Sequence, residues 1–546
     1  MLYFAGPLTT LIVTPWISFD PISLPKMVAL STLSFFGAAL LLVNQRQLLY
    51  TLDRKIRYSV LMFLLVMVLA IIFNDSQLQQ QIFGVFGRNT GALAYLSLFL
   101  ILLCAAVLQK NFLYNRLLNS LIFTSTVMTV YAIVQILGKD PVKWSQYDTF
   151  GTLGNINFLS AFFGLSTITL VALTFDKSLN VKIRSLMLIK AIIDSCIVLS
   201  TGSIQGIMMI LAGIGIIGFL FIYSQSFKLR TSILSAYIMA GLGAIGLVSL
   251  GLFNKGPLAG FIFQPSVIFR GDYWHAGWAL TMKDPFLGAG LDSYGDWYRE
   301  VRGEISTLRT NPDRIANTAH NIFLDISSSG GLLLLAPYLF LLGLVLYRSV
   351  KNIRATKYFD PVFIALLVSW IAYQIQSLVS INQLGVGVWG FLFTGCLLGY
   401  QFQSETVTAA DKGDRRKNKG RLLGAKESLM ATFGLLLGFT MGAIPMSSDI
   451  AFRNARNSLS AEELLQSTES FGASLFHKEL ALDLILQAGE AGRPPSLQLA
   501  KRIIEDHPRS FFTWVVLLNH PDAGEETREE ALNAIRALDP FNPNYR

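Results

Sequence analysis

Long apolar stretches recur along most of the chain, and short polar connections separate them. A helix needs roughly 20 mostly apolar residues to cross a bilayer core about 30 Å thick. Stretches of that length predict an all-α, polytopic membrane helix bundle of about 12–13 spans. The predicted spans are 2–18, 25–43, 58–73, 91–109, 117–137, 156–175, 185–200, 204–223, 231–253, 330–347, 360–378, 385–402 and 427–446. The first is the weakest, because it holds Gly6, Pro7 and Pro15.

Lysine and arginine residues gather in alternate connections between these spans. The connections 44–57, 348–357 and 403–426 are basic, whereas 19–24 holds no lysine or arginine. Because positively charged short loops stay in the cytoplasm, the N-terminus is predicted to be cytoplasmic and the tail after 446 extracytoplasmic. We interpret 403–426 as a stop-transfer segment and lipid-headgroup anchor.

The composition supports the membrane interpretation. Of 546 residues, 52% are hydrophobic and only 14% are charged, whereas soluble proteins carry about 25% charged residues. This excludes a cytosolic enzyme, a disordered protein and a secreted disulfide scaffold. The three cysteines lie in apolar runs, which offers no metal cluster. The basic loops explain the net charge of +9. The expected partner is therefore the lipid bilayer, and no nucleic acid is expected to bind.

The chain has two large polar segments, and one of them is the tail, 447–546, which follows a membrane domain, 1–446. The membrane domain contains a large extracytoplasmic loop, 254–329. In the tail, Ala500–Pro508 and Ala531–Pro540 share an outline about one tetratricopeptide period apart. The tail is therefore predicted to be a small helical-repeat domain, with a plain helical bundle as the alternative. A repeat surface would suit docking of an acceptor or a partner protein.

Charged residues are scarce inside the predicted spans. Lys190 and Asp194 are four residues apart and can pair on one helix face. Such a pair is either a functional group at membrane depth or an internal contact that fixes the helix. No chain of such groups is present in the spans, which argues against a proton or ion transporter.

The large loop is much richer in chemistry than the spans. Guanidinium groups bind phosphate oxygens bidentately, and aromatic rings offer apolar faces with a polar edge. Arginines beside aromatics therefore suit a substrate with phosphate at one end and sugar at the other. The candidate substrate-binding residues on this loop are Trp274, Arg302, Arg309 and Arg314. The alternative is a folded loop whose aromatics lie at the membrane interface.

Four strings in this order, 87–91, 150–160, 269–290 and 318–331, resemble the O-antigen ligase and O-antigen polymerase superfamily. The family's His-Asn pair, followed by nine residues and Gly, matches His320, Asn321 and Gly331. Its Arg-x-x-x-Trp setting before a Pro-x-x-Gly-x-Gly turn matches Arg270, Trp274, Pro285, Gly288 and Gly290. Its Gly-Asn-x-Asn-Phe turn matches Gly154, Asn155, Asn157 and Phe158. The resemblance covers about residues 60–400.

The chain departs from the family near residue 203, where the family often has a second arginine in Ser-Arg-Gly. Here Ile204 and Gln205 stand in that place. Arg88, an arginine of the large loop, or amide donors such as Gln205 are the candidates to replace it. Gly288 and Gly290 are interpreted as turn glycines and not as a nucleotide-binding loop, because they lack a strand–helix context.

The resemblance implies a membrane glycosyltransferase of lipopolysaccharide or other cell-envelope polysaccharide biosynthesis in the bacterial cytoplasmic membrane. Such an enzyme moves a glycan from an undecaprenyl-pyrophosphate carrier to an acceptor on the outer face, where the acceptor is a glycan, a lipid or a protein. Positive charge beside the leaving pyrophosphate stabilises the transition state most, because negative charge builds up there as the sugar–phosphate bond breaks. We assign that role to Arg270, with Arg88 second.

The acceptor hydroxyl needs a proton acceptor near neutral pH, and an imidazole is the natural choice. We assign this catalytic role to His320, with Asn321 orienting the histidine or the acceptor. Metal independence and the absence of a cofactor are expected, because the loop's acidic residues are dispersed along it. The competing interpretation is a polytopic lipid or glycan exporter with an outer recognition domain.

Overall fold

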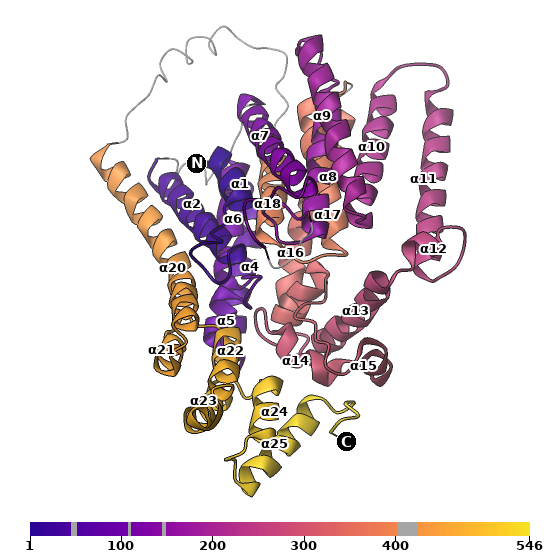
Figure 1. Cartoon of the computed structure of the whole chain (residues 1–546). Helices are drawn as coiled ribbons and strands as arrows, with labels where there is room; N and C mark the ends of the chain where they lie inside the picture. The colour runs from indigo at the N-terminus through magenta and orange to yellow at the C-terminus, as the bar shows by residue number, and fades with distance from the viewer. Residues whose placement is uncertain (45–51, 108–110, 145–148, 357, 401–423, 546) are drawn as a thin grey trace.

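The computed structural model describes residues 1–44, 52–107, 111–144, 149–356, 358–400 and 424–545. Within these residues the chain is a bundle of α-helices without β-strands (Figure 1). Helices long and apolar enough to cross a membrane are α2 (Ser23–Asn44), α4 (Arg54–Phe73), α7 (Asn111–Ile136), α8 (Ile156–Leu173), α10 (Ile204–Ser224), α11 (Arg230–Leu252), α16 (Ile322–Ala355) and α20 (Ala425–Ser458). The bundle also contains α9 (Val181–Ser200) and the shorter apolar helices α6 (Ala92–Ala106), α17 (Pro361–Ser377) and α18 (Leu384–Gly399). The predicted all-α polytopic bundle is therefore confirmed.

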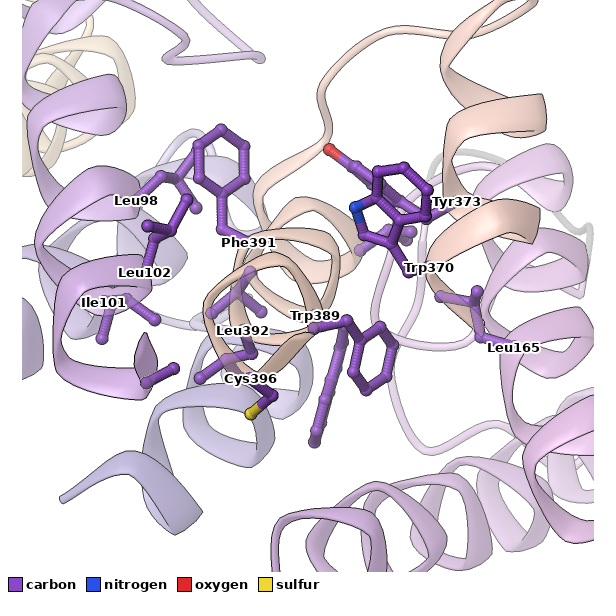
Figure 2. Packing of buried hydrophobic residues seen from close by; sticks show 14 of the residues in the cluster. Leu98, Ile101, Leu102, Leu165, Trp370, Tyr373, Trp389, Phe391, Leu392 and Cys396 are labelled. Carbon is purple, nitrogen blue, oxygen red and sulfur yellow. The ribbon is translucent and has the colours of Figure 1, made fainter. Parts of the chain in front are cut away.

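Helix α18 lies at the centre of the bundle, between α6 and α17 (Figure 2). Its Trp389 is fully buried, and the indole Nε1 donates to Thr10 Oγ1 at 2.9 Å. A Cβ atom added at Gly395 would lie 2.3 Å from the carbonyl oxygen of Leu102. Because apolar helices gain no hydrophobic free energy by leaving lipid, such close backbone contacts and interhelical hydrogen bonds hold them together.

Helices α2 and α20 pack along a row of glycines four residues apart. Cβ atoms at Gly434, Gly438 and Gly442 would each lie within 2.8 Å of an atom of α2. Ser31 Oγ also donates to the carbonyl oxygen of Gly438 at 2.8 Å. This small-residue spacing lets the two backbones approach closely, and it anchors the helix that leads into the tail.

The predicted first span, 2–18, is wrong in length. Helix α1 (Leu2–Leu11) has 10 residues, or about 15 Å at 1.5 Å per residue, which is half of a bilayer core. The chain then turns before α2, because the Lys26 ammonium donates to the carbonyl oxygens of Thr10 and Ile12 at 2.8 and 2.9 Å. These bonds satisfy the free end of α1 inside the bundle.

Two other predicted boundaries shift. Helix α16 begins at Ile322, eight residues before the predicted span 330–347, and is kinked at Gly330 and Gly331. Helix α20 continues past residue 446 to Ser458 without interruption. The division into 1–446 and 447–546 stays a prediction. The predicted basic anchor, 403–426, lies outside the described residues up to position 423.

The predicted pair in α9 is confirmed. Lys190 Nζ lies 2.8 Å from Asp194 Oδ1, and the carboxylate is fully buried. Asp194 also accepts hydrogen bonds from Thr129 of α7 and Ser166 of α8. The charged pair therefore joins three helices, which favours the internal-contact interpretation over a transport role.

The large loop and the tail lie at the same end of the bundle, the lower end in Figure 1. The loop forms α12 (Ala259–Ile262), α13 (Pro265–Lys283), α14 (Tyr294–Val301) and α15 (Glu304–Thr310), and α5 (Leu78–Phe83) lies beside it. The tail forms α21 (Ala461–Ser467), α22 (Leu475–Leu486), the 3-10 turn η1 (Gly489–Gly492), α23 (Arg493–Asp506), α24 (Phe511–Asn519) and α25 (Glu525–Leu538). We call this end the loop end. Its assignment to the extracytoplasmic side remains a prediction.

The two similar strings of the tail occupy equivalent places. Each ends a helix, α23 or α25, and each buries its alanine, Ala500 or Ala531. Ile503 and Ile535 are likewise buried one turn later. The tail is helical, as predicted, and the choice between a repeat and a plain bundle stays open.

Candidate active site

Arg88 lies in a tight loop, 84–91, that the large loop holds in shape. The Asp292 carboxylate accepts a hydrogen bond from the Val85 backbone N–H at 2.7 Å and from Thr90 Oγ1 at 3.1 Å. Gly84 has a φ of +84°, and a Cβ there would lie 2.6 Å from the same carboxylate. Asp292 thereby brings together two segments about 200 residues apart in sequence.

The Arg88 guanidinium has an N–H group that donates no hydrogen bond within the described structure. Its Nη1 atom is buried and has no hydrogen-bond partner among the described residues. Burial lowers the pKa of Arg88, and the charges of Asp292 and Asp325 oppose that shift. Because arginine stays charged in proteins, a buried N–H without a partner is a donor available to an anionic ligand.

His320 lies in a strained turn just before α16. Asp325 accepts from Thr318 Oγ1 and from the Ala319 N–H, both at 2.8 Å. His320 itself has a φ of +51°, a conformation that residues other than glycine rarely adopt. Asn321 caps α16 through its side-chain oxygen, which accepts from the N–H groups of Phe323 and Leu324. The turn is thus held from both sides, which maintains the strain.

The His320 ring faces α13. It stacks on Tyr273 with ring centroids 5.4 Å apart, and no hydrogen bond to its nitrogens is present in the described part of the chain. Burial, together with the charges of Arg88 and Arg270, lowers the pKa of His320 to about 3. The imidazole is therefore neutral at physiological pH and lies near both guanidinium groups.

Arg270 reaches this place from the second turn of α13. Its Nη1 donates to the carbonyl oxygen of Ser266 at 3.2 Å, while its Nε is buried without a partner among the described residues. Burial lowers the pKa of Arg270 as well. Trp274 lies one turn further along the same face, and its indole Nε1 is also buried and unpartnered in the described structure.

The structure thus brings His320, Arg270 and Arg88 together. Asn321 directly follows His320 in the chain, and Trp274 lies one helical turn after Arg270. Arg314 lies at the edge of this cluster, 4.9 Å from the ring of Phe269. Its charge also reaches Tyr273, where it counteracts the rise in pKa that burial causes. Arg309 pairs with Asp272 on α13 at 3.1 Å and is half exposed.

Two predicted residues are not part of the cluster. Arg302 is fully buried at the junction with the tail, where its Nη2 lies 2.7 Å from Asp539. The Asp539 carboxylate already compensates the charge of Arg302, whereas the sequence predicted a substrate group as its partner. Gln205 lies at the start of α10, and both amide atoms are buried without a partner among the described residues. No contact in the described structure links Gln205 to His320.

The predicted turn glycines are confirmed, and they join the motif strings. Gly288 and Gly290 have φ values of +67° and +100°. The Ala289 and Gly290 N–H groups donate to the carbonyl oxygens of Ser328 and Ser329 at 2.8 and 3.1 Å. The 285–290 turn therefore pairs with the kink of α16, and this contact fixes α13 and Arg270 relative to His320.

Substituting Gly331→Ala should destabilise this junction. Gly331 has a φ of +68°, and a Cβ would lie 2.1 Å from the carbonyl oxygen of Phe286. Gly331 also has a ψ of −175°, a region that essentially only glycine adopts and that costs an L-residue about 1–3 kcal/mol, and the clash adds to this cost. We expect a lower thermal unfolding midpoint and a lower yield. Gly343→Ala in the same helix is the control, since a Cβ there meets nothing within 4 Å. Equal midpoints for the two variants would contradict this account.

A second turn string also approaches the cluster. A cavity of about 160 Å³ beside Arg88 is lined by Gly154 and Phe158 among others. Asn155 caps α8, and the Asn157 side chain accepts from Ser203 Oγ, so both asparagines support the turn.

Among the described residues, no group of three or more His, Cys, Asp or Glu side chains is arranged to hold a metal ion. Metal independence remains a prediction.

Sequence reasoning missed Asp292 and Asp325 as organisers of the site. Asp325 had a local signal, since an acidic residue in the first turn of a helix favours its N-terminus. Asp292 had none, because its partners lie in a distant segment.

Comparison with known proteins gives one match, which covers the large loop and its flanking helices. A family model described as O-antigen ligase matches residues 189–339. The matched segment includes Arg270, His320 and the 285–290 turn, whereas Arg88 lies outside it. No curated protein matches the chain. The match confirms the predicted resemblance.

Proposed function

We propose a specific reaction for this multi-pass membrane protein, in which residues 189–339 match the O-antigen ligase family model. The protein transfers a glycan from an undecaprenyl-pyrophosphate carrier to an acceptor hydroxyl at the outer face of the bacterial cytoplasmic membrane. One observation carries the proposal: a neutral imidazole, His320, lies close enough to Arg88 and Arg270, two partly buried arginines, for their charges to lower its pKa.

The two arginines would bind the diphosphate of the donor. Each has a buried N–H atom without a protein partner among the described residues, and diphosphate oxygens are the acceptors that guanidinium groups bind best. The acceptor oxygen attacks the anomeric carbon as the bond from that carbon to phosphate oxygen breaks. The negative charge that develops on the leaving diphosphate is stabilised by Arg88 and Arg270.

His320 would take the proton from the attacking hydroxyl. Its ring nitrogens are unoccupied by described protein groups, and the ring is held in place by its stack on Tyr273. Asn321 uses its carbonyl oxygen to cap α16, so its amide N–H groups are left to orient the acceptor. We propose that Trp274, Arg309 and Arg314 contact the sugar and phosphate groups of the donor.

Binding of the donor should raise the basicity of His320. In the free protein burial, and after it the charges of Arg88 and Arg270, hold its pKa at about 3, which makes a weak base. An anionic diphosphate between the arginines offsets those two charges, so the pKa rises, while burial still holds it below its usual value of about 6.5. The imidazole would thereby become a better proton acceptor only when the donor is in place.

This coupling predicts a difference between two pH profiles. The free protein determines kcat/KM, and the donor complex determines kcat. A lowered pKa keeps His320 neutral as the pH falls, so kcat/KM should stay level down to about pH 5. The acid limb of kcat should lie at higher pH than that of kcat/KM. A kcat/KM profile that falls with an apparent pKa near 6.5 would contradict the arrangement.

Mass spectrometry of glycoconjugates from a strain that lacks the gene tests the proposed reaction. We expect a lipid-linked glycan to accumulate and one class of envelope molecule to lose its sugar. The wild-type gene should restore that product, and the His320→Ala gene should not. An unchanged glycoconjugate profile in the deletion strain would contradict the proposal.

A further inference from the structure

The tail is fixed on the large loop by buried charges and stacked rings. Asp539 accepts from Arg299 at 2.9 Å and from Arg302 at 2.7 Å. Phe476 of α22 stacks on Phe86 with ring centroids 4.5 Å apart and an interplanar angle of 6°. Since Phe86 lies in the 84–91 loop, the tail touches the segment that carries Arg88.

A cavity of about 430 Å³ lies between these surfaces, within the range of roughly 300–1,000 Å³ typical of small-molecule sites. One wall comes from the tail, and the other comes from α5, α14, the 84–86 segment and part of 313–317. Asn317 in that wall is three residues from His320, a span of at most about 11 Å along the chain. One wall of the cavity therefore comes within about 11 Å of the backbone of His320.

Two carboxyl groups line the cavity, Asp296 from the wall of the large loop and Glu479 from the wall of the tail. Asp296 accepts from Gln80 Nε2 at 2.8 Å, and Glu479 accepts from Ser510 Oγ at 2.6 Å. In each group the second oxygen has no hydrogen-bond partner among the described residues. Burial raises the pKa of Asp296 to about 6 and that of Glu479 to about 7. Each free oxygen is available to a hydroxyl of a ligand.

The rest of the lining is largely aromatic and apolar. Phe511 and Tyr545 meet edge to face with centroids 5.9 Å apart, and Phe86 and Phe476 line the opposite part. Arg299 lies over one face of Phe511, and Phe86 and Phe476 cover one face of each other. The opposite ring faces suit the C–H faces of sugar rings. A second cavity of about 690 Å³ shares Asp296, Arg509 and Ser510 with the first, which extends the space away from His320.

The charges in the cavity select against an anionic ligand. Arg299 is paired with Asp539, and Arg509 is paired with Glu300. The charged groups left unpaired are therefore carboxyls, which repel phosphates and acidic sugars and hydrogen-bond to neutral hydroxyls. This contrasts with the unpaired guanidinium groups proposed to hold the donor.

We infer that the cavity between the tail and the large loop is the acceptor subsite, and that it binds a neutral glycan chain. The inference rests on the proposed glycosyl transfer and adds the class of acceptor. Asp296 and Glu479 hydrogen-bond to sugar hydroxyls, and the aromatic rings stack on the sugar faces. The end of the chain nearest Asn317 presents its hydroxyl to His320.

The test is an array of immobilised neutral oligosaccharides of hexoses and N-acetylhexosamines, with carboxylated and sulfated counterparts. The probe is the full-length protein in labelled lipid nanodiscs. Wild type and the exposed-carboxyl control Glu490→Gln should bind the neutral oligosaccharides alike. The double variant Asp296→Asn/Glu479→Gln should bind them at least about tenfold more weakly, since hydrogen bonds to charged groups are lost.

A second variant guards against misfolding of the first. Ile315 lines the cavity and is half exposed, so Ile315→Trp should fill the cavity, keep its charges and weaken binding as well. A wild type without binding, a preference for acidic oligosaccharides, or full binding by both variants would overturn the acceptor subsite. Wild-type binding without any transfer product in the deletion strain would instead overturn the proposed function, so the two failures are distinguishable.

Discussion

His320→Ala should lower the rate of glycan transfer by about 10²–10⁴-fold, which is the usual contribution of a general base. The imidazole is the neutral group that we place beside the attacking hydroxyl, and its removal leaves water as the proton acceptor. Because the ring stacks on the partly buried Tyr273 and makes no hydrogen bond to a described residue, the variant should still insert and express. Transfer by purified protein in liposomes with a lipid-linked donor measures the effect.

The matched control is His275→Ala. His275 is the other histidine of the large loop, lies on the same helix as Arg270 and is exposed. We expect this variant to transfer glycan at the wild-type rate. If His320→Ala also kept the full rate while expressing normally, the assignment of the base would be wrong.

Arg270→Ala and Arg88→Ala should each lower kcat by about 10²–10³-fold, as the loss of one preorganised charge donor does at other oxyanion sites. The expected pattern is a fall in kcat with a smaller change in KM, because the charge on the diphosphate grows as the bond breaks. The double variant should lose less than the product of the single effects, since both groups stabilise the same charge. Steady-state kinetics of the three variants measures this.

Arg493→Ala serves as the control for loss of a positive charge. Arg493 is at the surface of the tail, beside the exposed Glu490. It should leave kcat and KM unchanged. Wild-type kinetics for both Arg88→Ala and Arg270→Ala would remove the proposed diphosphate site.

The spans were predictable because the bilayer imposes a length and an apolar composition on each of them. The misjudged segments are those where tertiary contacts decide the end of a helix. Helix α1 stops at Leu11 because the Lys26 ammonium takes the last carbonyl oxygens. Helix α16 starts early because Asn321 caps it in a polar stretch without a long apolar run.

The centre of the site was predictable from short strings, and its supports were not. Arg270 and His320 belong to recognisable motifs, whereas Asp292 acts on a loop about 200 residues away. Sequence patterns report local periodicity, so they carry no signal for such long-range pairs. Arg302 is a further example: its position among arginines and aromatics predicts a substrate contact, and the structure adds a long-range pair with Asp539 of the tail.

The most direct measurement of the central claim is the fate of a lipid-linked diphosphate glycan in liposomes that contain the purified protein. We predict that the glycan moves onto a neutral oligosaccharide supplied outside, with release of an equal amount of polyprenyl diphosphate. Translocation of the intact donor across the bilayer, with no glycan joined to the oligosaccharide, would contradict the account and favour an exporter.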